Sequence, residues 1–445
     1  MCAARLAPSS DRQRVAVVGG GWAGCAAAVE LAARGAAVTL YEASRTLGGR
    51  ARVVRMQGKS LDNGQHILLG AYRETLRLMR HLGIAEESAL LRLPLQMCYP
   101  DGSGMHFVAA RLPAPLHVGA ALLRSRGLAR QDKMALARFS TTARWMGWQL
   151  HQDCSVSELL VRFEQTDRLV QLMWRPLCIA ALNTPPERAS ARVFLHVLRD
   201  SLGARRAASD MLLPRVDLSD LFPARAAAYL ESRDGRVVLG AAVDALERDG
   251  EHWRIQGEQH DAVVIATPPP QAAALLAPHA PAAQMPAFEW ESITTVYLQY
   301  AADVRLARPF FALVDQPEAG HWGQFVFDRG QLNAGDAGLL AVVISASGPA
   351  LDLGNDSLPP QVAAQLAQAL GRPELAAPLW TKVISEKRAT FACTPGLLRP
   401  SNDTGIDGLA LAGDYTASDY PATLESAVRS GVAAAALLAH GKRTA

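Results

Sequence analysis

The 445-residue sequence predicts an α/β protein in which two domains are interleaved along the chain. Apolar runs typical of buried strands occur in three separate pieces: near the N-terminus, between residues 231 and 285, and after residue 400. The first run is followed by a glycine-rich turn and an alanine-rich helix. The residues between these pieces have other patterns, first helical and later β-rich. We therefore expect one domain to be assembled from three pieces of chain, with a second domain inserted between them.

The first piece contains a strand, a turn and a helix in succession. Three glycines with the spacing G-x-G-x-x-G follow the apolar run Val15–Val18: Gly19, Gly21 and Gly24. The spacing permits a tight turn, a close approach of backbone to pyrophosphate, and close packing of the helix expected from Trp22 to Arg34. Glu42 ends the next apolar strand, where a carboxylate accepts hydrogen bonds from an adenosine ribose. The pattern predicts a Rossmann-like dinucleotide site, and an ordinary glycine-rich turn is the alternative.

A second glycine segment favours FAD over a nicotinamide as the bound dinucleotide. Gly48, Gly49 and Arg50 follow the second strand and resemble the G-G-R segment of the flavoprotein superfamily that holds amine oxidases and phytoene desaturases. The resemblance implies that the arginine approaches the pyrophosphate and that the glycines let the backbone pass close to the cofactor. A plain NAD dehydrogenase has no need of this segment.

The second piece contains four short β-like runs: Arg236–Leu239, Val243–Leu246, Trp253–Gln256 and Ala262–Ala266. The segment from Val263 to Pro269 resembles the strand and loop that return the chain to the cofactor domain in this superfamily. The resemblance implies that Val243 lies where a backbone amide and carbonyl contact the adenine.

The third piece resembles the closing flavin motif of the same superfamily. Leu409 to Ala412 is typical of a buried strand, and it ends in Gly413 and Asp414. The resemblance implies that Asp414 binds the sugar-like chain of the flavin and that Gly413 permits the close approach. A helix is expected from about Thr423 to His440, and its first residues, Thr423, Leu424 and Glu425, would direct free N–H groups at the flavin ring.

These observations predict a Rossmann-like FAD-binding domain formed by residues 12–91, 231–285 and 400–445. Residues 92–230 and 286–399 would form a mixed α+β substrate domain. Its first half is expected to be largely helical, and its second half to contain strands such as Ile293–Tyr300 and Leu339–Ile344.

Four segments resemble one group within the superfamily: Leu61 to Tyr72, Trp174 to Thr184, Glu386 to Thr390, and Gly413 to Thr416. The group is the squalene-associated flavin desaturases, better described as hydroxysqualene dehydroxylases of the bacterial hopanoid pathway. The resemblance covers nearly the whole chain. It implies that a hydride from non-covalently bound, reduced FAD replaces the allylic hydroxyl of a long apolar isoprenoid and gives squalene. NADPH is the expected reductant of the flavin.

Breaking the C–O bond of such an alcohol requires a proton donor. His66 is the leading candidate, because an ordinary imidazole can hold a proton near neutral pH. Gln65 and Asp62 are further catalytic candidates, with Asn63 and Tyr420 as alternatives, and Gly64 would let the loop pass close to the flavin. His66 would equally suit a hydrogen bond to the backbone or to the flavin.

Water must be kept from the reacting carbon, which calls for an apolar tunnel. Five apolar residues suit such a tunnel and would also suit an ordinary core: Trp174, Pro176, Leu177, Ile179 and Leu182. Lys387 and Arg388 are expected to pair with surface carboxylates rather than to act in catalysis.

Composition indicates an enzyme without a nucleic-acid partner. The net charge of +3 is too small to favour nucleic acid. Six scattered cysteines with no C-x-x-C pair indicate neither a metal site nor a disulfide framework, and a reducing cytoplasm is the simplest compartment. No signal peptide or membrane-spanning run is evident, so we expect any membrane contact to be peripheral.

Residues 122–150 are the candidate segment for that contact. They contain six basic residues against one acid, Asp132, with Phe139, Trp145 and Trp148 interleaved. A basic helix with aromatic residues can lie on the anionic inner face of the cytoplasmic membrane. A solvated basic helix face explains the pattern equally well.

Three other functions fit parts of the sequence. A carotenoid-type desaturase would transfer hydride in the opposite direction through a similar tunnel. A flavin amine oxidase would be expected to place a lysine near the flavin; residues 293–300 contain none, although Lys382 and Lys387 remain. A flavin-bound scaffold without turnover is disfavoured, because all three cofactor segments are present.

Overall fold

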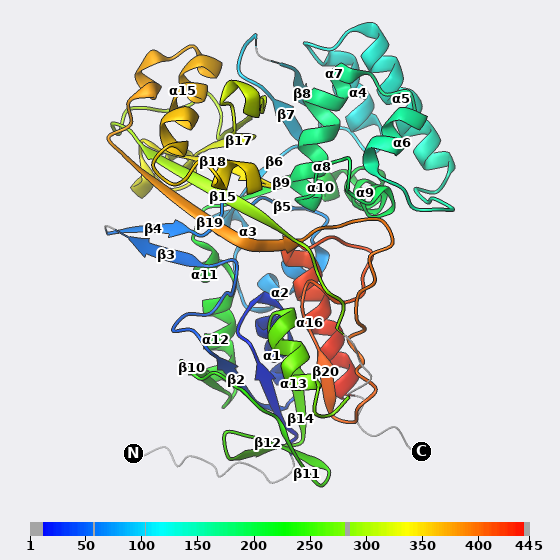
Figure 1. Cartoon of the computed structure of the whole chain (residues 1–445), viewed down its shortest axis with the longest axis vertical. Helices are drawn as coiled ribbons and strands as arrows, with labels where there is room; N and C mark the ends of the chain where they lie inside the picture. The colour runs from blue at the N-terminus through cyan, green and yellow to red at the C-terminus, as the bar shows by residue number, and fades with distance from the viewer. Residues whose placement is uncertain (1–11, 57, 103, 281–284, 440–445) are drawn as a thin grey trace.

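The computed structural model describes residues 12–56, 58–102, 104–280 and 285–439. Figure 1 shows a lower part that contains a parallel sheet flanked by helices, and an upper part with a β-rich half and a helical half. The chain enters the lower part three times.

The parallel sheet contains strands from all three predicted pieces, as the sequence analysis expected. Its strand order is β10-β2-β1-β14-β20, and every neighbouring pair is parallel. The strands are β1 (Arg14–Val18), β2 (Ala37–Glu42), β10 (Arg236–Leu239), β14 (Ala262–Ile265) and β20 (Leu409–Leu411). A parallel sheet covered by helices buries both faces, which explains why the strands are almost wholly apolar.

Two helices from opposite ends of the chain pack together beside this sheet. Helix α1 (Trp22–Ala33) contacts α16 (Leu424–Ala439) along its length (Figure 1). The contact is close because a Cβ atom on Gly431 would lie 2.1 Å from the carbonyl oxygen of Ala23. Glycine at this position therefore fixes how near the two helices approach.

One segment lies on the other side of the predicted domain boundary. The sequence analysis placed residues 92–230 in the substrate domain, whereas α11 (Leu218–Leu221) and α12 (Pro223–Glu231) pack in the apolar cluster of the parallel sheet. Phe222 between them is fully buried and contacts the ring of Trp22 at 5.1 Å. The apolar strand pattern begins only at β10, and the sequence of the two short helices before it does not indicate which domain they pack against.

The β-rich half of the upper part is an antiparallel sheet in the order β16-β17-β18-β15-β19. Its strands are β15 (Trp290–Gln299), β16 (Phe310–Ala312), β17 (Phe325–Asp328), β18 (Leu339–Ser345) and β19 (Trp380–Phe391). Helix α15 (Leu358–Leu370) packs against it, and the expected strands at 293–300 and 339–344 are confirmed.

The other half is helical, as expected. Its helices are α4 (Leu116–Arg124), α5 (Arg130–Trp145), α6 (Val156–Arg162), α7 (Asp167–Leu169), α8 (Arg175–Leu182), α9 (Ala191–Leu198) and α10 (Arg206–Ser209). Two small sheets, β5 (Leu68–Leu69) with β9 (Met211–Pro214) and β6 (Leu90–Leu93), and β7 (Gln96–Cys98) with β8 (His106–Val108), lie beside these helices. None of the helices described here has the length and apolar character needed to cross a membrane.

Shorter elements complete the described chain. They are β3 (Val53–Met56), β4 (Lys59–Asp62), α2 (Arg73–His81), α3 (Glu86–Ala89), β11 (Glu247–Asp249), β12 (His252–Ile255), β13 (Glu258–His260), α13 (Pro269–Leu276) and α14 (Gly348–Leu351).

The expected strand at Val243–Leu246 is wrong: this stretch is irregular, and the next strand begins at Glu247. The chain before it is held by the loop after β2, since Gly240 N donates to Ser44 O and Ala241 N to Glu42 O, each at 2.9 Å.

The α1–α16 contact predicts the effect of enlarging Gly431. The substitution Gly431→Val should lower the free energy of unfolding by about 1–3 kcal/mol, because the added methyl groups cannot fit against the backbone of α1. Thermal unfolding measures the change. Ala433→Val on the exposed side of the same helix is the matched control, and equal melting temperatures for the two variants would contradict this account.

Candidate cofactor site

The glycine turn after β1 has the backbone geometry that its spacing predicts. Gly19 has φ +107°, a conformation that disfavours other residues. A Cβ atom on Gly24 would lie 1.8 Å from the carbonyl oxygen of Gly19, so helix α1 approaches β1 too closely for any side chain there. A Cβ atom on Gly21 would meet no protein atom within 4 Å. The space above Gly21, at the N-terminus of α1, is therefore open to a ligand.

The second glycine segment lies directly against this turn. Gly48 N donates to Gly20 O at 2.8 Å, and a Cβ atom on Gly49 would come within 3.2 Å of Gly21 Cα. Gly48 and Gly49 both have positive φ, +110° and +59°. The two motifs, which are separate in sequence, form one cradle of backbone N–H groups, the arrangement that binds pyrophosphate at a helix N-terminus.

Glu42 is held at the end of β2. Its Oε2 accepts a hydrogen bond from Gly20 N at 2.6 Å, and its Oε1 accepts from the backbone N and the Oγ of Ser44, both at 2.8 Å. These contacts fix the carboxylate beside the glycine turn. Oε1 already accepts two hydrogen bonds, so the lone pair that remains for a ribose hydroxyl is on Oε2.

Arg50 connects the first and third pieces of the domain. Its Nη2 donates to Asp414 Oδ1 at 2.5 Å, and its Nη1 donates to the carbonyl oxygen of Ala389 at 2.8 Å. Burial alone would lower the pKa of Arg50, but the adjacent Asp414 outweighs burial and raises it. The pair therefore places a fixed positive group beside the closing motif, and Ala389, on β19, contributes through its backbone.

The closing motif is built around Ser430 and Tyr415. Gly413 N donates to Ser430 Oγ at 2.9 Å, and a Cβ atom on Gly413 would lie 2.3 Å from the Tyr415 ring. The Tyr415 hydroxyl donates to Thr267 O at 3.0 Å and so connects this motif to the loop after β14. Tyr415 belongs to the Gly413–Thr416 segment that carries the resemblance, whereas no sequence motif points to Ser430.

The first turn of α16 differs in detail from the expectation. Thr423 caps the helix, because its Oγ1 accepts from Ser426 N at 3.2 Å, and Leu424 is partly buried in the core. The Glu425 carboxylate points away to α2, where it accepts hydrogen bonds from Glu74 N and Thr75 N at 3.1 and 3.0 Å. Glu425 therefore caps α2, and the first turn of α16 offers a flavin its backbone amides alone.

The segment after β4 is tied to the G-G-R segment through Asn63. The Asn63 Nδ2 donates to Arg50 O, and its Oδ1 accepts from Arg52 N at 3.1 Å. Both contacts hold the backbone next to the cradle. Asn63 thus acts on the shape of the site, and its amide groups are already satisfied.

Asp62 and Gln65 both contact a buried arginine from the substrate half. Arg329 Nη1 donates to Gln65 Oε1 at 3.0 Å and lies 3.5 Å from Asp62 Oδ2, and Arg329 Nη2 lies 3.1 Å from Asp336 Oδ2. Burial raises the pKa of Asp62 to about 6, although Arg329 opposes the shift. Tyr297 adds a hydrogen bond to Asp62 O at 2.8 Å. Nothing in the sequence around Arg329, Asp336 or Tyr297 signals this network.

His66 does not meet the condition on which its assignment rested. Its Nδ1 lies 2.7 Å from Gly64 O and donates to it, which leaves Nε2 as an acceptor in the neutral ring. Burial lowers the pKa of His66 from its ordinary value, and the bond to Gly64 offsets this only in part. The ring is therefore neutral near pH 7, whereas the sequence analysis assumed an unperturbed imidazole.

Most of the residues suggested for a tunnel belong to the core. Trp174, Pro176, Ile179 and Leu182 are buried, and the Trp174 ring packs 4.6 Å from that of Phe139. Leu177 is only partly buried. Lys387 and Arg388 are exposed on β19, and no ion pair involves either of them in the part of the chain that the structure describes.

Val243 remains close to the site without being part of the sheet. It is partly buried and lies two residues beyond Ala241, whose amide is bonded to Glu42 O. The cradle, Glu42 and the Arg50–Asp414 pair lie together at the carboxyl edge of a parallel sheet, where open α/β folds bind ligands, and form the candidate dinucleotide site. Arg50 and Asp414 join the first and the last piece of the chain there.

The chain belongs to the family of flavin containing amine oxidoreductases, whose model matches residues 22–439. Solved structures have the same fold. A putative protoporphyrinogen oxidase from Exiguobacterium superposes with a TM-score of 0.66 at 18% identity, covering 97% of this chain and 99% of the other. A putrescine oxidase superposes with a TM-score of 0.65 at 16% identity, covering 96% and 99%. The protein is thus a flavin-dependent oxidoreductase with an α/β fold.

The relatives found by sequence similarity have names that state a particular reaction. A hydroxysqualene dehydroxylase from Rhodopseudomonas palustris is 30% identical, covering 95% of this chain and 98% of the relative. One from Sinorhizobium fredii is 29% identical, covering 96% and 98%. A zeta-carotene desaturase from Zea mays is 25% identical, covering 94% of this chain and 82% of the relative.

The Arg50–Asp414 pair predicts a measurable effect on flavin affinity. Asp414→Asn keeps the size of the side chain but removes the charge, so it leaves Arg50 without its ionic partner and weakens the contact expected between the carboxylate and a bound flavin. We expect FAD binding to weaken by about 10- to 100-fold. Titration of flavin-free protein with FAD, followed by quenching of flavin fluorescence, gives the dissociation constant. Asp356→Asn on an exposed loop is the control, and an unchanged affinity in Asp414→Asn would contradict the assignment.

Proposed function

We propose that this protein catalyses FAD-dependent reductive removal of the allylic hydroxyl of hydroxysqualene to give squalene, within squalene and hopanoid biosynthesis. The observation behind this proposal is the alignment over nearly the full chain with relatives named hydroxysqualene dehydroxylase. The Leu61–Tyr72 segment, which carries the most specific resemblance, is joined to the G-G-R segment through Asn63.

The reaction divides the work between cofactor and protein. Bound reduced FAD supplies a hydride, and NADPH is the proposed source of its electrons. The carbon–oxygen bond of the substrate breaks, the oxygen leaves as water after gaining one proton, and the carbon gains the hydride. The protein must orient the substrate, exclude bulk water and deliver that proton. Arg50, Glu42 and Asp414 hold the cofactor in this scheme.

We retain His66 as the proton donor, with Asp62 and Gln65 in a supporting role. A lowered pKa makes the imidazolium of His66 rarer but more acidic, so it transfers a proton readily once formed. Asp62 and Gln65 are committed to Arg329 and instead fix the loop that presents His66. Leu177, the partly buried member of the tunnel set, is the proposed contact with the substrate chain.

Peripheral contact with the inner face of the cytoplasmic membrane remains part of the proposal, with a revised surface. In segment 122–150, Phe139 and Trp148 are buried and cannot reach a membrane. Trp145 and Leu123 are exposed, by 87% and 78% of their surface. Contact with the membrane would let the protein take up an apolar substrate that is dissolved in the lipid.

A carotenoid-type desaturase is the second candidate. Zeta-carotene desaturases align with 94% or more of this chain. That reaction would take a hydride from a hydrocarbon and reduce the flavin. The two candidates therefore differ in whether the reaction oxidises or reduces the flavin, and the flavin absorbance reports which occurs.

An anaerobic single-turnover experiment separates them. The FAD-loaded protein is reduced in deuterium oxide and mixed with hydroxysqualene, while absorbance follows the flavin and mass spectrometry follows the product. We expect squalene that contains one added deuterium, formed at the rate of flavin reoxidation. Unchanged alcohol and a flavin that stays reduced would refute the proposal, and reduction of oxidised enzyme by zeta-carotene would favour the desaturase.

The role of His66 predicts a pH dependence. Because only the protonated ring can donate, the rate of flavin reoxidation should rise as pH falls through and below the ordinary imidazole range near 6.5. His66→Gln should be slower by about 100-fold or more and should lack this rise. His81→Gln, at an exposed position of α2, should keep the full profile. A pH rise that survives in His66→Gln would assign the proton to another group.

A further inference from the structure

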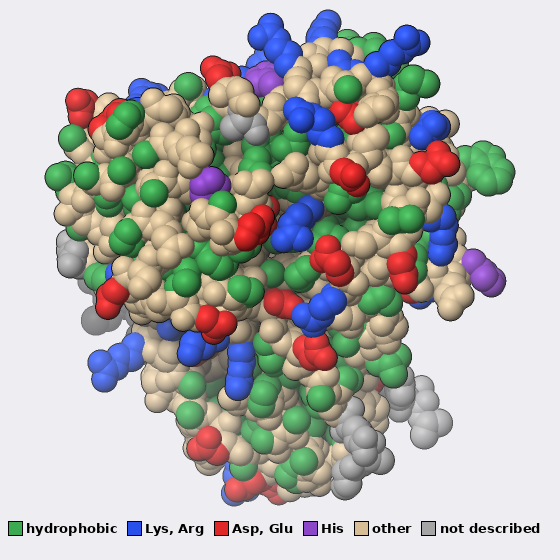
Figure 2. Space-filling model, turned by 45° about the horizontal axis from the view of Figure 1, so that its top comes forward, with side chains coloured by type: hydrophobic (Ala, Val, Ile, Leu, Met, Phe, Trp, Pro, Cys, Tyr) green, Lys and Arg blue, Asp and Glu red, His purple; other side chains and the backbone are tan. Residues whose placement is uncertain are grey.

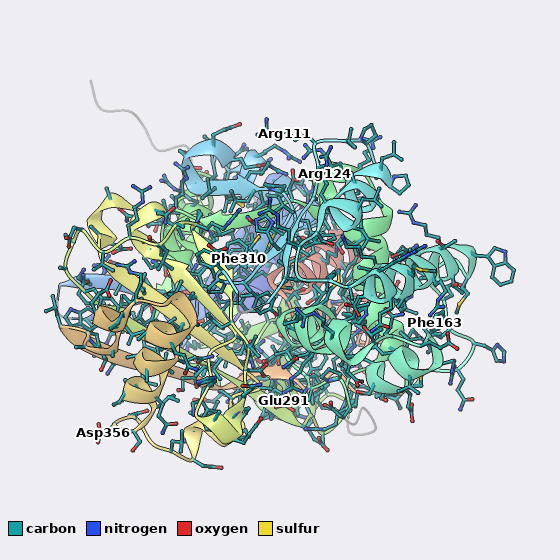
Figure 3. The ribbon with its side chains drawn as sticks, turned by 90° about the horizontal axis from the view of Figure 1, so that it is seen from above. Arg111, Arg124, Phe163, Glu291, Phe310 and Asp356 are labelled. Carbon is teal, nitrogen blue, oxygen red and sulfur yellow. The ribbon has the colours of Figure 1, made fainter. Side chains whose placement is uncertain are left out.

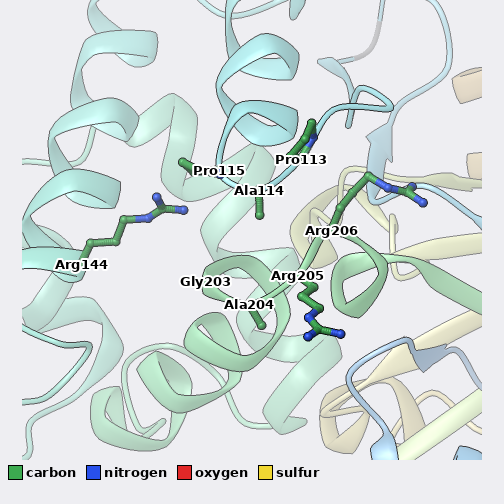
Figure 4. A pocket seen from close by; sticks show the side chains of 8 residues that line it. All are labelled: Pro113, Ala114, Pro115, Arg144, Gly203, Ala204, Arg205 and Arg206. Atoms are coloured by element: carbon green, nitrogen blue, oxygen red, sulfur yellow. The ribbon is translucent and has the colours of Figure 1, made fainter.

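Two adjoining pockets on the helical side of the molecule each have several arginines among their lining residues. The first has a volume of about 380 Å³ and lies between residues 113–115, Arg144 of α5 and residues 203–206 (Figure 4). The second has a volume of about 530 Å³ and lies between α2, Glu86 of α3 and residues 205–208. Arg205 lines both. We call them together the arginine cleft; its arginines are Arg73, Arg80, Arg92, Arg144, Arg205 and Arg206.

One buried carboxylate holds part of the cleft in place. Asp210 is 2% exposed, and it forms ion pairs with Arg92 of the second pocket at 3.1 Å and with Arg206 of the first at 3.2 Å. Arg92 also pairs with Glu86 at 2.5 Å. These contacts fix two of the guanidinium groups, so the wall between the pockets is preorganised.

The other arginines of the cleft are not neutralised. Among the described residues, no ion pair involves Arg73, Arg80, Arg144 or Arg205, and the one acid that lines the cleft, Glu86, is already bound to Arg92. Figure 4 shows Arg144 projecting into the opening from α5, opposite the turn that bears Arg205 and Arg206. These four side chains are exposed, and an anion bound among them would accept several charge-assisted hydrogen bonds.

A buried histidine connects α4 to α10 beside the first pocket. His117 of α4 is fully buried, and its Nε2 lies 3.2 Å from Ser209 Oγ. Burial lowers the pKa of His117, and the positive fields of Arg206 and Arg144 lower it further. Arginines from α5 and from α10 therefore both act on His117, which Asp210 partly offsets.

We propose that the arginine cleft is a binding site for the phosphate or diphosphate group of an anionic ligand, separate from the flavin site. Guanidinium groups donate in pairs to phosphate oxygens and stay charged at every working pH, which makes arginine the usual residue for this recognition. The volume of each pocket accommodates such a group together with part of the molecule that bears it. The proposal does not depend on the reaction proposed above.

The surroundings of the first pocket favour a lipid headgroup as the source of the phosphate. Leu112 and Leu116 flank the wall formed by residues 113–115 and are 39% and 61% exposed, and Leu123 lies further along α4. Figure 3 places Arg111 and Arg124 together at the same edge of the molecule. Figure 2 shows Lys and Arg side chains gathered over the upper edge of the helical half. A soluble phosphate compound would satisfy the same arginines without using the leucines.

The test uses the FAD-loaded protein and two probes. Calorimetric titration with inorganic diphosphate measures binding of the free anion, and sedimentation with phosphatidylglycerol or phosphatidylcholine vesicles measures binding to lipid. The variant Arg144→Gln/Arg205→Gln removes one unpaired arginine from each wall. We expect it to raise the dissociation constant for diphosphate, or for phosphatidylglycerol vesicles, by about tenfold or more.

A matched variant separates a site from general charge. Arg111→Gln/Arg124→Gln removes the same charge outside the cleft and should change diphosphate binding less than twofold. Loss of both bindings in the cleft variant supports the site with either source, and loss for vesicles alone assigns it to lipid. Equal effects of the two variants on diphosphate binding, or no binding of either probe by the unmodified protein, would overturn the proposal. If the double variant does not fold, Arg205→Gln alone replaces it.

Discussion

The ion pair between Arg50 and Asp414 is the contact on which the site depends. It joins residues from the first and last pieces of the chain at 2.5 Å, and the same arginine binds the backbone of β19 in the substrate half. Three parts of the fold therefore meet at one guanidinium group. A side chain that is charged at every working pH suits this position, because the contact does not vary with conditions.

The second constraint is the close approach of backbone segments to one another. It limits which residue types can occupy these positions. Where Gly24 meets Gly19 and Gly431 meets Ala23, there is no room for a side chain. The cofactor can then be held mostly by N–H groups and helix ends, which do not vary with residue type. The few side chains that take part, such as Glu42 and Asn63, serve largely to fix that backbone.

The sequence predicted the parts of the fold and site that follow from local spacing. The glycine turn and the sheet assembled from three pieces depend on short patterns with a mechanical cause, and the structure contains both; the order of the strands was not predicted. Contacts between residues that are far apart in the sequence could not be predicted in this way. The Glu425 carboxylate caps α2 rather than facing a flavin, and Arg329 reaches Asp62 across 267 positions of sequence. The burial of Phe139 similarly depends on partners, Phe163 and Trp174, that no periodicity identifies.

The interleaved order of the chain also governs how the protein can be assembled. Strand β20 is the last strand of the parallel sheet, and α16 packs against the first helix, α1. During synthesis, β1 and the glycine turn emerge early but lack Asp414, β20 and the helix that covers them until the end. The apolar helix α1 stays exposed until the C-terminal segments have been made, because contacts between distant parts of a chain form late. The complete cofactor site can therefore form only after the last segment of the polypeptide has been made.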